Sequence, residues 1–195
     1  MIKVGLTGQM GSGKSYCARL FERLGVPVFY TDDVAREVIN TNKELKNKIV
    51  SEFGEVYDSD GKMIPSKIRN IVFTGNDARL LKLNELSHPY VFKEFEKFCD
   101  RHNDKQYILA ESAILFETKL RDHVDEVIYV NADEKLRIKR TFERSGFSEI
   151  EYRQRMKNQL SSDYKISMSD FVITNNDDDD VKKQVEEINN KLNEL

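Results

Sequence analysis

Five short apolar runs along the chain are typical of buried β-strands. They lie at residues 2–6, 26–29, 107–110, 127–130 and 171–174. The first run is followed by a glycine-rich turn, a helical pattern and the second run. This order implies a parallel pair of strands joined by a right-handed crossover. The pattern therefore predicts an α/β protein with a central parallel sheet of about five strands.

The middle of the chain, residues 34–103, shows no strand pattern. Residues 45–53 carry one helical stripe, and a longer helical stretch, residues 68–98, is interrupted at His88-Pro89. A helical segment of this size between two strands predicts an insertion that forms its own lobe.

Further helices are predicted at residues 15–24, 134–144, 149–164 and 181–195. The chain carries four consecutive aspartates, residues 177–180, just before the last of these helices. We expect a solvated loop that supplies the N-cap of the following helix, rather than a metal site.

The composition limits the classes to which the chain can belong. Of its 195 residues, 39% are hydrophobic, which is enough to build a core. The net charge of -3 gives no overall basic field for nucleic acid. There is no signal-peptide pattern, and no apolar run approaches the roughly 18 residues of a membrane span. Cys17 and Cys99 are predicted to be reduced thiols. We therefore expect a cytoplasmic protein without nucleic-acid or membrane partners, and we expect a monomer.

Residues 8–15 read Gly-Gln-Met-Gly-Ser-Gly-Lys-Ser and match the P-loop pattern G-x-x-x-x-G-K-S/T. The loop lies between a predicted strand and a predicted helix, which is the context that the motif requires. Its glycines allow backbone N–H groups to surround an anion, and the helix N-terminus adds partial positive charge. Lys14 would contact the β- and γ-phosphates, and the Ser15 hydroxyl would bind Mg²⁺. The alternative is a glycine-rich turn that merely joins strand to helix.

Three classes of P-loop protein compete. A GTPase would need an N-K-x-D motif, but residues 42–45 read Asn-Lys-Glu-Leu. A motor or transport ATPase usually needs a longer chain and an apolar run that ends in Asp-Glu. A small-molecule kinase fits best, because Asp32 follows the second strand at the edge where open α/β sheets bind ligands. Asp32 is a candidate general base; alternatively it is the N-cap of the following helix, a role that Asp33 could take instead.

A cluster of cations predicts the mobile lid that such kinases close over the phosphates. Arg137, Arg140 and Arg144 are three and four residues apart and share a helix face, and Lys139 lies among them. Like charges on one face repel each other, and a triphosphate would neutralise them. The alternative is a solvated face in which nearby glutamates are the partners.

Further short motifs stand in order along the chain. They are residues 5–15, residues 24–28, Thr31-Asp32 with Ala35-Arg36, Phe53-Gly54, Asp60-Gly61, Val72-Phe73, Leu83-Asn84, His88-Pro89, Leu115-Phe116-Glu117, Arg140 with Arg144, Gln159, Ser169-Asp170 and Asn175. Their order and spacing resemble the dephospho-CoA kinase family over nearly the whole chain. The chain departs from the family pattern at Tyr30, Pro65, Glu111 and Ala113. Of these, Glu111 keeps a charge near the strand end and could serve the Mg²⁺ shell through water.

The resemblance implies that ATP phosphorylates the ribose 3′-hydroxyl of dephospho-CoA, with Mg²⁺ beside Ser15. The implied catalytic residues are Asp32, Lys14 and Arg140. The implied nucleotide-binding residues are Gly11, Ser12, Gly13, Lys14, Ser15, Tyr16, Arg140, Arg144 and Asn175, the last of them near the adenine. The implied acceptor-binding residues are Asp32, His88, Phe116 and Glu117. Taken alone, a histidine before a proline is more often a structural hydrogen-bonding group.

The resulting prediction is a single P-loop kinase domain with a nucleotide-kinase-like, three-layer fold. Its core comprises about residues 1–33, 104–136 and 166–195, its helical acceptor lobe about 34–103 and its lid about 137–165. Two other functions stay open at this point. One is another small-molecule or nucleoside-monophosphate kinase on the same core, and the other is a P-loop binding or regulatory module with slow ATPase activity.

Overall fold

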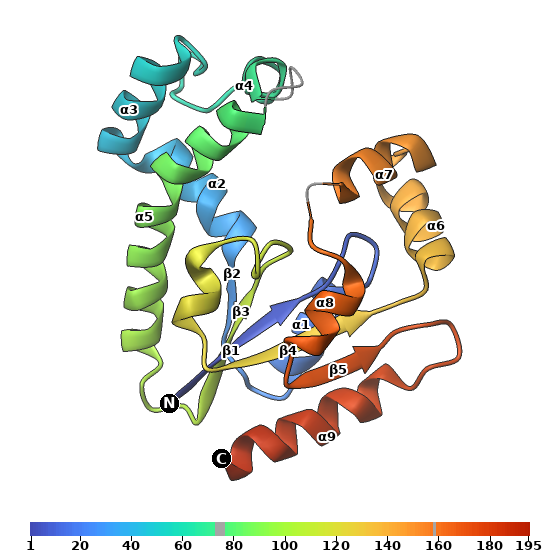
Figure 1. The fold of residues 1–195 in the computed structure, drawn as a ribbon. Helices are drawn as coiled ribbons and strands as arrows, with labels where there is room; N and C mark the ends of the chain where they lie inside the picture. Colours follow the sequence, from blue (N-terminus) through green and yellow to red (C-terminus); the bar gives the residue numbers. More distant parts are fainter. Residues whose placement is uncertain (73–76, 158) are drawn as a thin grey trace. The chain divides into compact units, whose positions relative to one another are not determined.

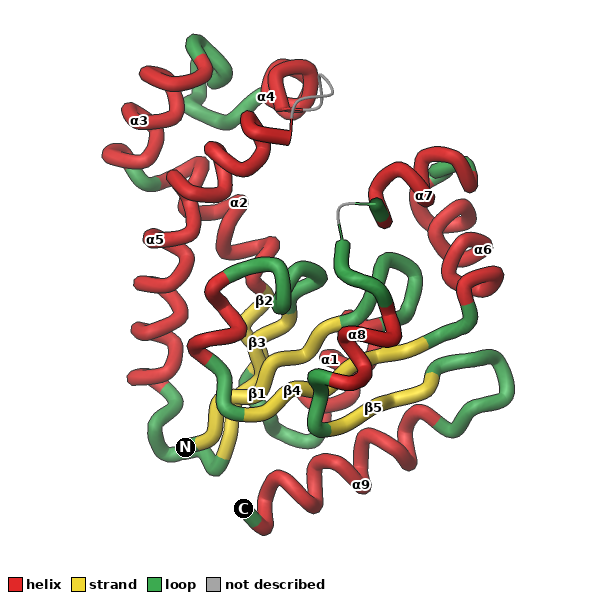
Figure 2. Tube along the Cα trace, in the orientation of Figure 1, coloured by secondary structure: helices red, strands yellow, loops and turns green. Residues whose placement is uncertain are grey.

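The structure is a computed structural model that describes residues 1–72, 77–157 and 159–195. Phe73, one of the residues that carry the family resemblance, lies outside the described residues. Within them, five strands form one parallel sheet (Figures 1 and 2). The strands are β1 (Ile2–Thr7), β2 (Val28–Tyr30), β3 (Tyr107–Glu111), β4 (Glu126–Asn131) and β5 (Phe171–Thr174). All five predicted strands are confirmed.

The strand order across the sheet is β2-β3-β1-β4-β5, and every neighbouring pair is parallel. β1 therefore lies at the centre, between β3 and β4. Because the strands are parallel, their carboxyl ends meet at one edge of the sheet, where α/β proteins bind ligands. The P-loop follows β1 directly, so it lies at this edge.

The described chain divides into two compact units, Met1–Tyr30 with Arg101–Leu195, and Thr31–Asp100. The first unit contains the sheet. Its helices are α1 (Lys14–Arg23), the short 3₁₀ helix η1 (Lys119–His123), α6 (Glu134–Ser145), α7 (Glu149–Met156), α8 (Ser162–Ser167) and α9 (Val181–Glu194).

The main core lies between one face of the sheet and helices α1 and α9. Val4 of β1, Phe21 of α1 and Leu192 of α9 are fully buried in it. Burial of each such side chain contributes about 2 kcal/mol. On the other face, a side chain at Gly5 would collide with Leu115, which follows β3. Both faces are thus covered, which is why the strands read as continuous apolar runs.

The prediction of one helix over residues 149–164 is wrong. α7 ends at Met156 and α8 begins at Ser162. The Ser161 hydroxyl caps α8 by accepting a hydrogen bond from the Tyr164 N–H at 3.2 Å. Both the N–H and the C=O of Leu160 are bound by residues distant in sequence. Local capping and these tertiary hydrogen bonds outweigh the helical spacing of the side chains.

The second unit is helical, as predicted. Its helices are α2 (Thr31–Thr41), α3 (Lys43–Phe53), α4 (Pro65–Val72) and α5 (Asp77–Arg101), whose final residue belongs to the first unit. The predicted stripe of α3 is buried, and Asn42 caps this helix by accepting from the Leu45 N–H at 3.0 Å.

α5 runs through Pro89, so the predicted interruption at His88-Pro89 is wrong. Proline removes one hydrogen bond of a helix and strains the preceding turn. Pro89 is exposed, however, whereas Val91 and Phe95 of the same helix are buried. Burial of the apolar side therefore outweighs the local cost. In the described parts of the chain, no helix is both long enough and apolar enough to cross a membrane.

Cys17 and Cys99 are both free thiols, and both are buried. Burial raises the pKa of the Cys17 thiol to about 12, so this group stays protonated at neutral pH.

Candidate active site

The P-loop takes its shape from two glycines with left-handed backbone conformations, Gly11 at φ 84° and Gly13 at φ 91°. A Cβ at Gly11 would collide with the backbone oxygen of Arg137, and one at Gly13 with the side-chain amide of Asn175. That amide donates a hydrogen bond to the Ser12 carbonyl at 2.7 Å. The loop is thus fitted closely against α6 and against the segment after β5.

α1 begins at Lys14, the seventh residue of the P-loop motif, without a side-chain cap and without an acidic residue in its first turn. The first N–H groups of a helix have no partner within the helix, and together they favour an anion. The loop and helix therefore provide the environment that a phosphate group needs.

Glu111 contacts the last two residues of the P-loop motif, the charged Lys14 and the neutral Ser15. It lies at the end of β3, its side chain is only 4% exposed, and its Oε1 is 2.6 Å from Lys14 Nζ. The Ser15 hydroxyl donates to the same oxygen at 3.0 Å. In the sequence Glu111 appeared as a departure from the family pattern that keeps a charge near the strand end, and its contact with Lys14 was not predicted. Its place beside Lys14 follows from the parallel pairing of β1 and β3.

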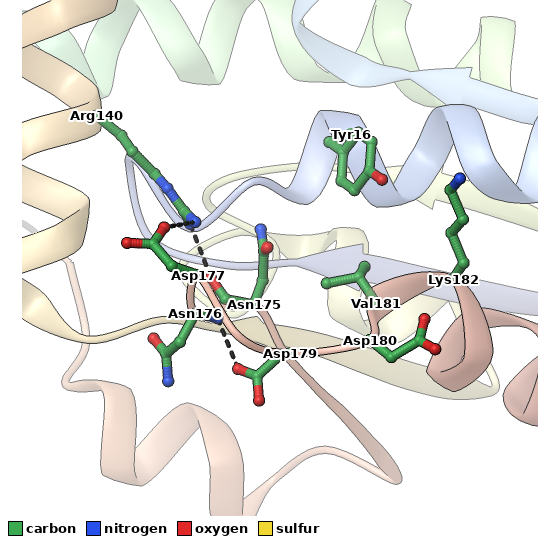
Figure 3. Close-up of a pocket in the computed structure, with 9 residues that line it drawn as sticks. All are labelled: Tyr16, Arg140, Asn175, Asn176, Asp177, Asp179, Asp180, Val181 and Lys182. Carbon is green, nitrogen blue, oxygen red and sulfur yellow. Dashed lines mark hydrogen bonds and ion pairs between the residues drawn. The ribbon is translucent and has the colours of Figure 1, made fainter.

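A pocket of about 290 Å³ opens beside the P-loop. Figure 3 shows its lining, to which Tyr16 of α1, Arg140 of α6 and residues 175–177 and 179–182 contribute. Arg140 donates from NH1 to the Asn175 carbonyl at 2.7 Å and from NH2 to the Asp177 carboxylate at 3.3 Å. Because Asn175 also binds Ser12, the pocket and the P-loop are joined through one residue.

The acidic run supplies the N-cap of the following helix, as the sequence predicted. Asp180 is the N-cap of α9 and accepts from the Lys183 N–H at 3.1 Å. Asp179 accepts from the Asn176 N–H at 2.7 Å. Within the described residues, no group of three or more His, Cys, Asp or Glu side chains is suited to hold a metal ion.

The three arginines of α6 lie in different environments. Arg137 is buried, and its Nε and NH1 atoms have no hydrogen-bond partner among the described residues. Burial raises the pKa of Tyr152, and the nearby Arg137 charge opposes this rise. Arg140 faces the pocket, and Arg144 is exposed, with its Nε donating to the Ser145 hydroxyl at 3.4 Å.

Phe116 and Glu117 follow β3, and both are half-buried. Glu117 Oε1 is 2.7 Å from Nζ of Lys165, whose side chain is completely buried. The same oxygen accepts from the Leu160 N–H at 2.9 Å. This ion pair fixes the chain between α7 and α8. Lys165 was not predicted from the sequence, because a single lysine in a charged helical segment gives no signal of burial.

Gln9 of the P-loop holds the same segment from the other side. Its Nε2 donates to the Leu160 carbonyl at 3.2 Å, and its Oε1 accepts from the Ser162 hydroxyl at 2.9 Å. Gln9 occupies a variable position of the P-loop pattern. The motif predicts no particular contact for such a position, so this contact could not be predicted from it. The chain that returns from α6 and α7 is thereby attached to the P-loop.

Two further predicted site residues belong to the second unit. Asp32 is exposed in the first turn of α2. Because α2 begins at Thr31, neither Asp32 nor Asp33 is its N-cap, and Asp33 accepts from Arg36 NH1 at 3.0 Å. His88 lies on α5 with its ring centroid 5.9 Å from that of Phe92, and burial lowers its pKa.

Two departures from the family pattern have local structural explanations. The Tyr30 hydroxyl donates to the Glu22 carboxylate of α1 at 2.9 Å. Burial is the larger cause and this hydrogen bond the second cause of a raised pKa of Tyr30. Pro65 is the first residue of α4. Proline suits the first turn of a helix, where its missing N–H would have no partner.

The fold and the site define a P-loop kinase-like protein, with a parallel sheet, a phosphate-binding loop after β1 and an acidic residue at the end of β3. A model of the family described as dephospho-CoA kinase matches residues 2–180. The chain belongs to the dephospho-CoA kinase family.

Individual relatives agree with this assignment. The chain is 36% identical over 177 residues to a dephospho-CoA kinase of Bacillus cereus, covering 89% of this chain and 88% of that one. The crystal structure of TT1252 from Thermus thermophilus superposes with a TM-score of 0.83 at 27% identity, covering 100% of this chain and 97% of that one. A dephospho-CoA kinase from Campylobacter jejuni shares the fold, with a TM-score of 0.73 at 20% identity over 98% of this chain and 97% of that one.

Proposed function

We propose that this chain transfers the γ-phosphoryl group of ATP to the ribose 3′-hydroxyl of dephospho-CoA, giving coenzyme A and ADP. The observation that carries the proposal is its membership of the dephospho-CoA kinase family over residues 2–180. The alternative of another small-molecule or nucleoside-monophosphate kinase is not favoured, because the relatives named above are dephospho-CoA kinases.

ATP is proposed to place its phosphates in the P-loop and its adenine toward the pocket near Asn175. The N–H groups around Gly11, Ser12, Gly13 and Lys14 and the α1 N-terminus would surround the phosphates. Lys14 would bring a full positive charge to the β- and γ-phosphates. Tyr16 and Asn175 both line the pocket, and this supports the proposed placement of the base.

Arg140 and Arg144 are proposed to close over the phosphates with the lid. Closure would exclude water and bring guanidinium charge to the phosphoryl group as it is transferred. Arg140 faces the pocket already, and Arg144 is one helical turn further along α6.

Ser15 is the proposed protein ligand of Mg²⁺. The site fits this cation, because the Ser15 hydroxyl and the Glu111 carboxylate are hard oxygen donors whose atoms lie 3.0 Å apart. Mg²⁺ takes most of its ligands from phosphates and water, so it does not require a cluster of protein carboxylates. When bound, it would neutralise charge on the phosphates. Glu111 would hold a water of its shell.

Asp32 is proposed to orient the acceptor hydroxyl and to take its proton. In the reaction, a bond forms between the 3′-oxygen and the γ-phosphorus, the bond to the β–γ bridging oxygen breaks, and the hydroxyl proton leaves. His88, Phe116 and Glu117 are the other residues proposed to receive the acceptor. The second unit, Thr31–Asp100, is proposed to act as the acceptor lobe, and residues 137–165 as the lid.

The test measures coenzyme A formation from ATP, Mg²⁺ and dephospho-CoA, using parent chain, Asp32→Asn and Asp33→Asn. The two aspartates are adjacent in the first turn of α2 and carry the same charge. We expect robust turnover for the parent and for Asp33→Asn. For Asp32→Asn we expect a fall in kcat of about 10²-fold or more, with ATP binding retained.

The same assay separates the alternatives. Turnover with a nucleoside monophosphate but not with dephospho-CoA would overturn the proposed acceptor. Nucleotide binding without turnover on any acceptor would indicate a binding module instead. Equal activity of the two aspartate variants would remove Asp32 from the mechanism without affecting the reaction type. Measurement of molar mass in solution would test the expected monomer.

A further inference from the structure

In the acidic loop after β5, residues 177–180, the Asp177 carboxylate binds the side chain of Arg140, which lines the pocket. Asp179 and Asp180 bind backbone N–H groups of their own segment. Asp177 instead reaches Arg140 of α6, with Oδ1 at 3.3 Å from NH2. Figure 3 shows the Asp177 carboxylate and the Arg140 guanidinium facing each other at the pocket.

Arg140 is one of the residues that the proposed mechanism assigns to the phosphates. Its side chain is 28% exposed, so it keeps access to solvent and to a ligand. Its guanidinium is held by the Asn175 carbonyl and by the Asp177 carboxylate. Carboxylate and phosphate oxygens bind a guanidinium with the same geometry. A nucleotide phosphate and Asp177 would therefore compete for the same donors.

We propose that Asp177 determines nucleotide affinity by occupying Arg140 until the phosphates of the nucleotide displace it. This inference rests on the proposed function, because it takes Arg140 as a phosphate ligand. When a binding group is available only part of the time, the apparent affinity equals the intrinsic affinity multiplied by the fraction of time that the group is available. The carboxylate also repels the incoming polyanion.

The loop does not depend on Asp177 for its shape. Asp179 binds the Asn176 N–H, and the Asn176 side chain accepts from the Asp133 N–H at 2.9 Å. The Asp177 side chain is 75% exposed. Its removal should therefore release Arg140 without unfolding the segment.

The neighbouring Asp178 provides a matched control. It is exposed, carries the same charge in the same loop and does not line the pocket. Asp177→Asn and Asp178→Asn remove one negative charge each, so their long-range effects on a polyanion should be similar. The difference between them isolates the contact with Arg140.

The experiment measures the Kd of ATP by calorimetry, without acceptor, for the parent and both asparagine variants. Because an exposed ion pair contributes up to about 1 kcal/mol, we expect Asp177→Asn to bind ATP about two- to five-fold more tightly than Asp178→Asn. The difference should shrink at high salt, which screens exposed charges. Equal affinities for the two variants, or weaker binding by Asp177→Asn, would overturn the inference.

A second pair of variants identifies the cause. In an Arg140→Ala background, the effect of Asp177→Asn should fall to that of Asp178→Asn, because the competing cation is gone. A persistent difference would show that Asp177 acts by another route and would also overturn the inference. Product formation by the parent chain tests the proposed function separately, so the two failures are distinguishable.

Discussion

Lys14 and Glu111 form an ion pair with 2.6 Å between Nζ and Oε1, across the carboxyl ends of two neighbouring strands. The two residues are 97 positions apart in the sequence. The pair places a buried carboxylate next to the lysine and the hydroxyl of the P-loop. It holds the lysine in place and keeps an acidic oxygen beside the hydroxyl of Ser15, the proposed ligand of Mg²⁺.

Lys14→Met should separate stability from activity. The variant leaves the Glu111 carboxylate buried with the Ser15 hydroxyl as its remaining partner, and we expect a loss of about 3 kcal/mol in the free energy of unfolding. Adding Glu111→Gln removes the unpaired charge and should recover most of this loss. Activity should stay absent in both variants, because neither has the cation that is proposed to bind the phosphates. Urea unfolding and ADP release check these outcomes; a double variant no more stable than the single one would contradict the argument.

Gly11→Ala should damage the P-loop more than its backbone angle alone explains. The substitution forces a side chain into a left-handed conformation and against the Arg137 carbonyl. Gly25 has a similar φ of 85° but nothing within 4 Å of an added Cβ, so Gly25→Ala isolates the conformational cost. We expect that cost to be about 1 kcal/mol, with a further 1–3 kcal/mol or so for the collision at Gly11.

Thermal unfolding of both glycine variants, with and without ATP, is the measurement. Gly25→Ala should keep the stabilisation that ATP provides, and Gly11→Ala should lose it. Equal losses of stability in the two variants would show that the collision with the Arg137 carbonyl is relieved without loss of unfolding free energy.

Lys165→Met should destabilise the protein strongly, although no ligand is expected to touch this lysine. Removing the ammonium leaves Glu117 without its counter-ion, at an expected cost of about 3–5 kcal/mol. Lys165→Met with Glu117→Gln should be more stable than Lys165→Met, because the glutamine oxygen can still accept from the Leu160 N–H. Lys135→Met changes an exposed lysine and serves as the control. A loss in Lys165→Met no larger than in this control would refute the buried pair.

His88 should make stability depend on pH. Burial lowers the pKa of the folded imidazole below its ordinary value of 6.5, so the unfolded chain binds more protons as the pH falls through this value. The free energy of unfolding should therefore decrease below about pH 6.5, by at most about 1.4 kcal/mol per pH unit. His88→Gln should reduce this decrease, and His123→Gln, at an exposed position, should not. The measurement is urea unfolding at about pH 7.5 and about pH 5.5. An equal decrease in the free energy of unfolding for the parent and His88→Gln would count against the buried neutral imidazole.

Two helix boundaries were predicted wrongly from the sequence pattern. Apolar spacing predicted one helix over residues 149–164, but α7 ends at Met156 and α8 begins at Ser162. Between them, the N–H of Leu160 is bound by Glu117 and its C=O by Gln9. Pro89 predicted a break in α5, but the helix continues through this residue because burial of its apolar side outweighs the local cost. In both cases distant contacts decided against the local signal.

The sequence by itself determined the five strands, the P-loop and its lysine and serine, because these depend on continuous apolar runs and on glycine spacing, which are local properties. Family resemblance added the expected acceptor. Only the tertiary structure decided that Glu111 meets Lys14, that Lys165 is buried against Glu117, and that Asp177 holds Arg140. Each of these pairs joins residues far apart in the chain. Strand order and loop packing bring them together, and no local pattern encodes the partners of these three pairs.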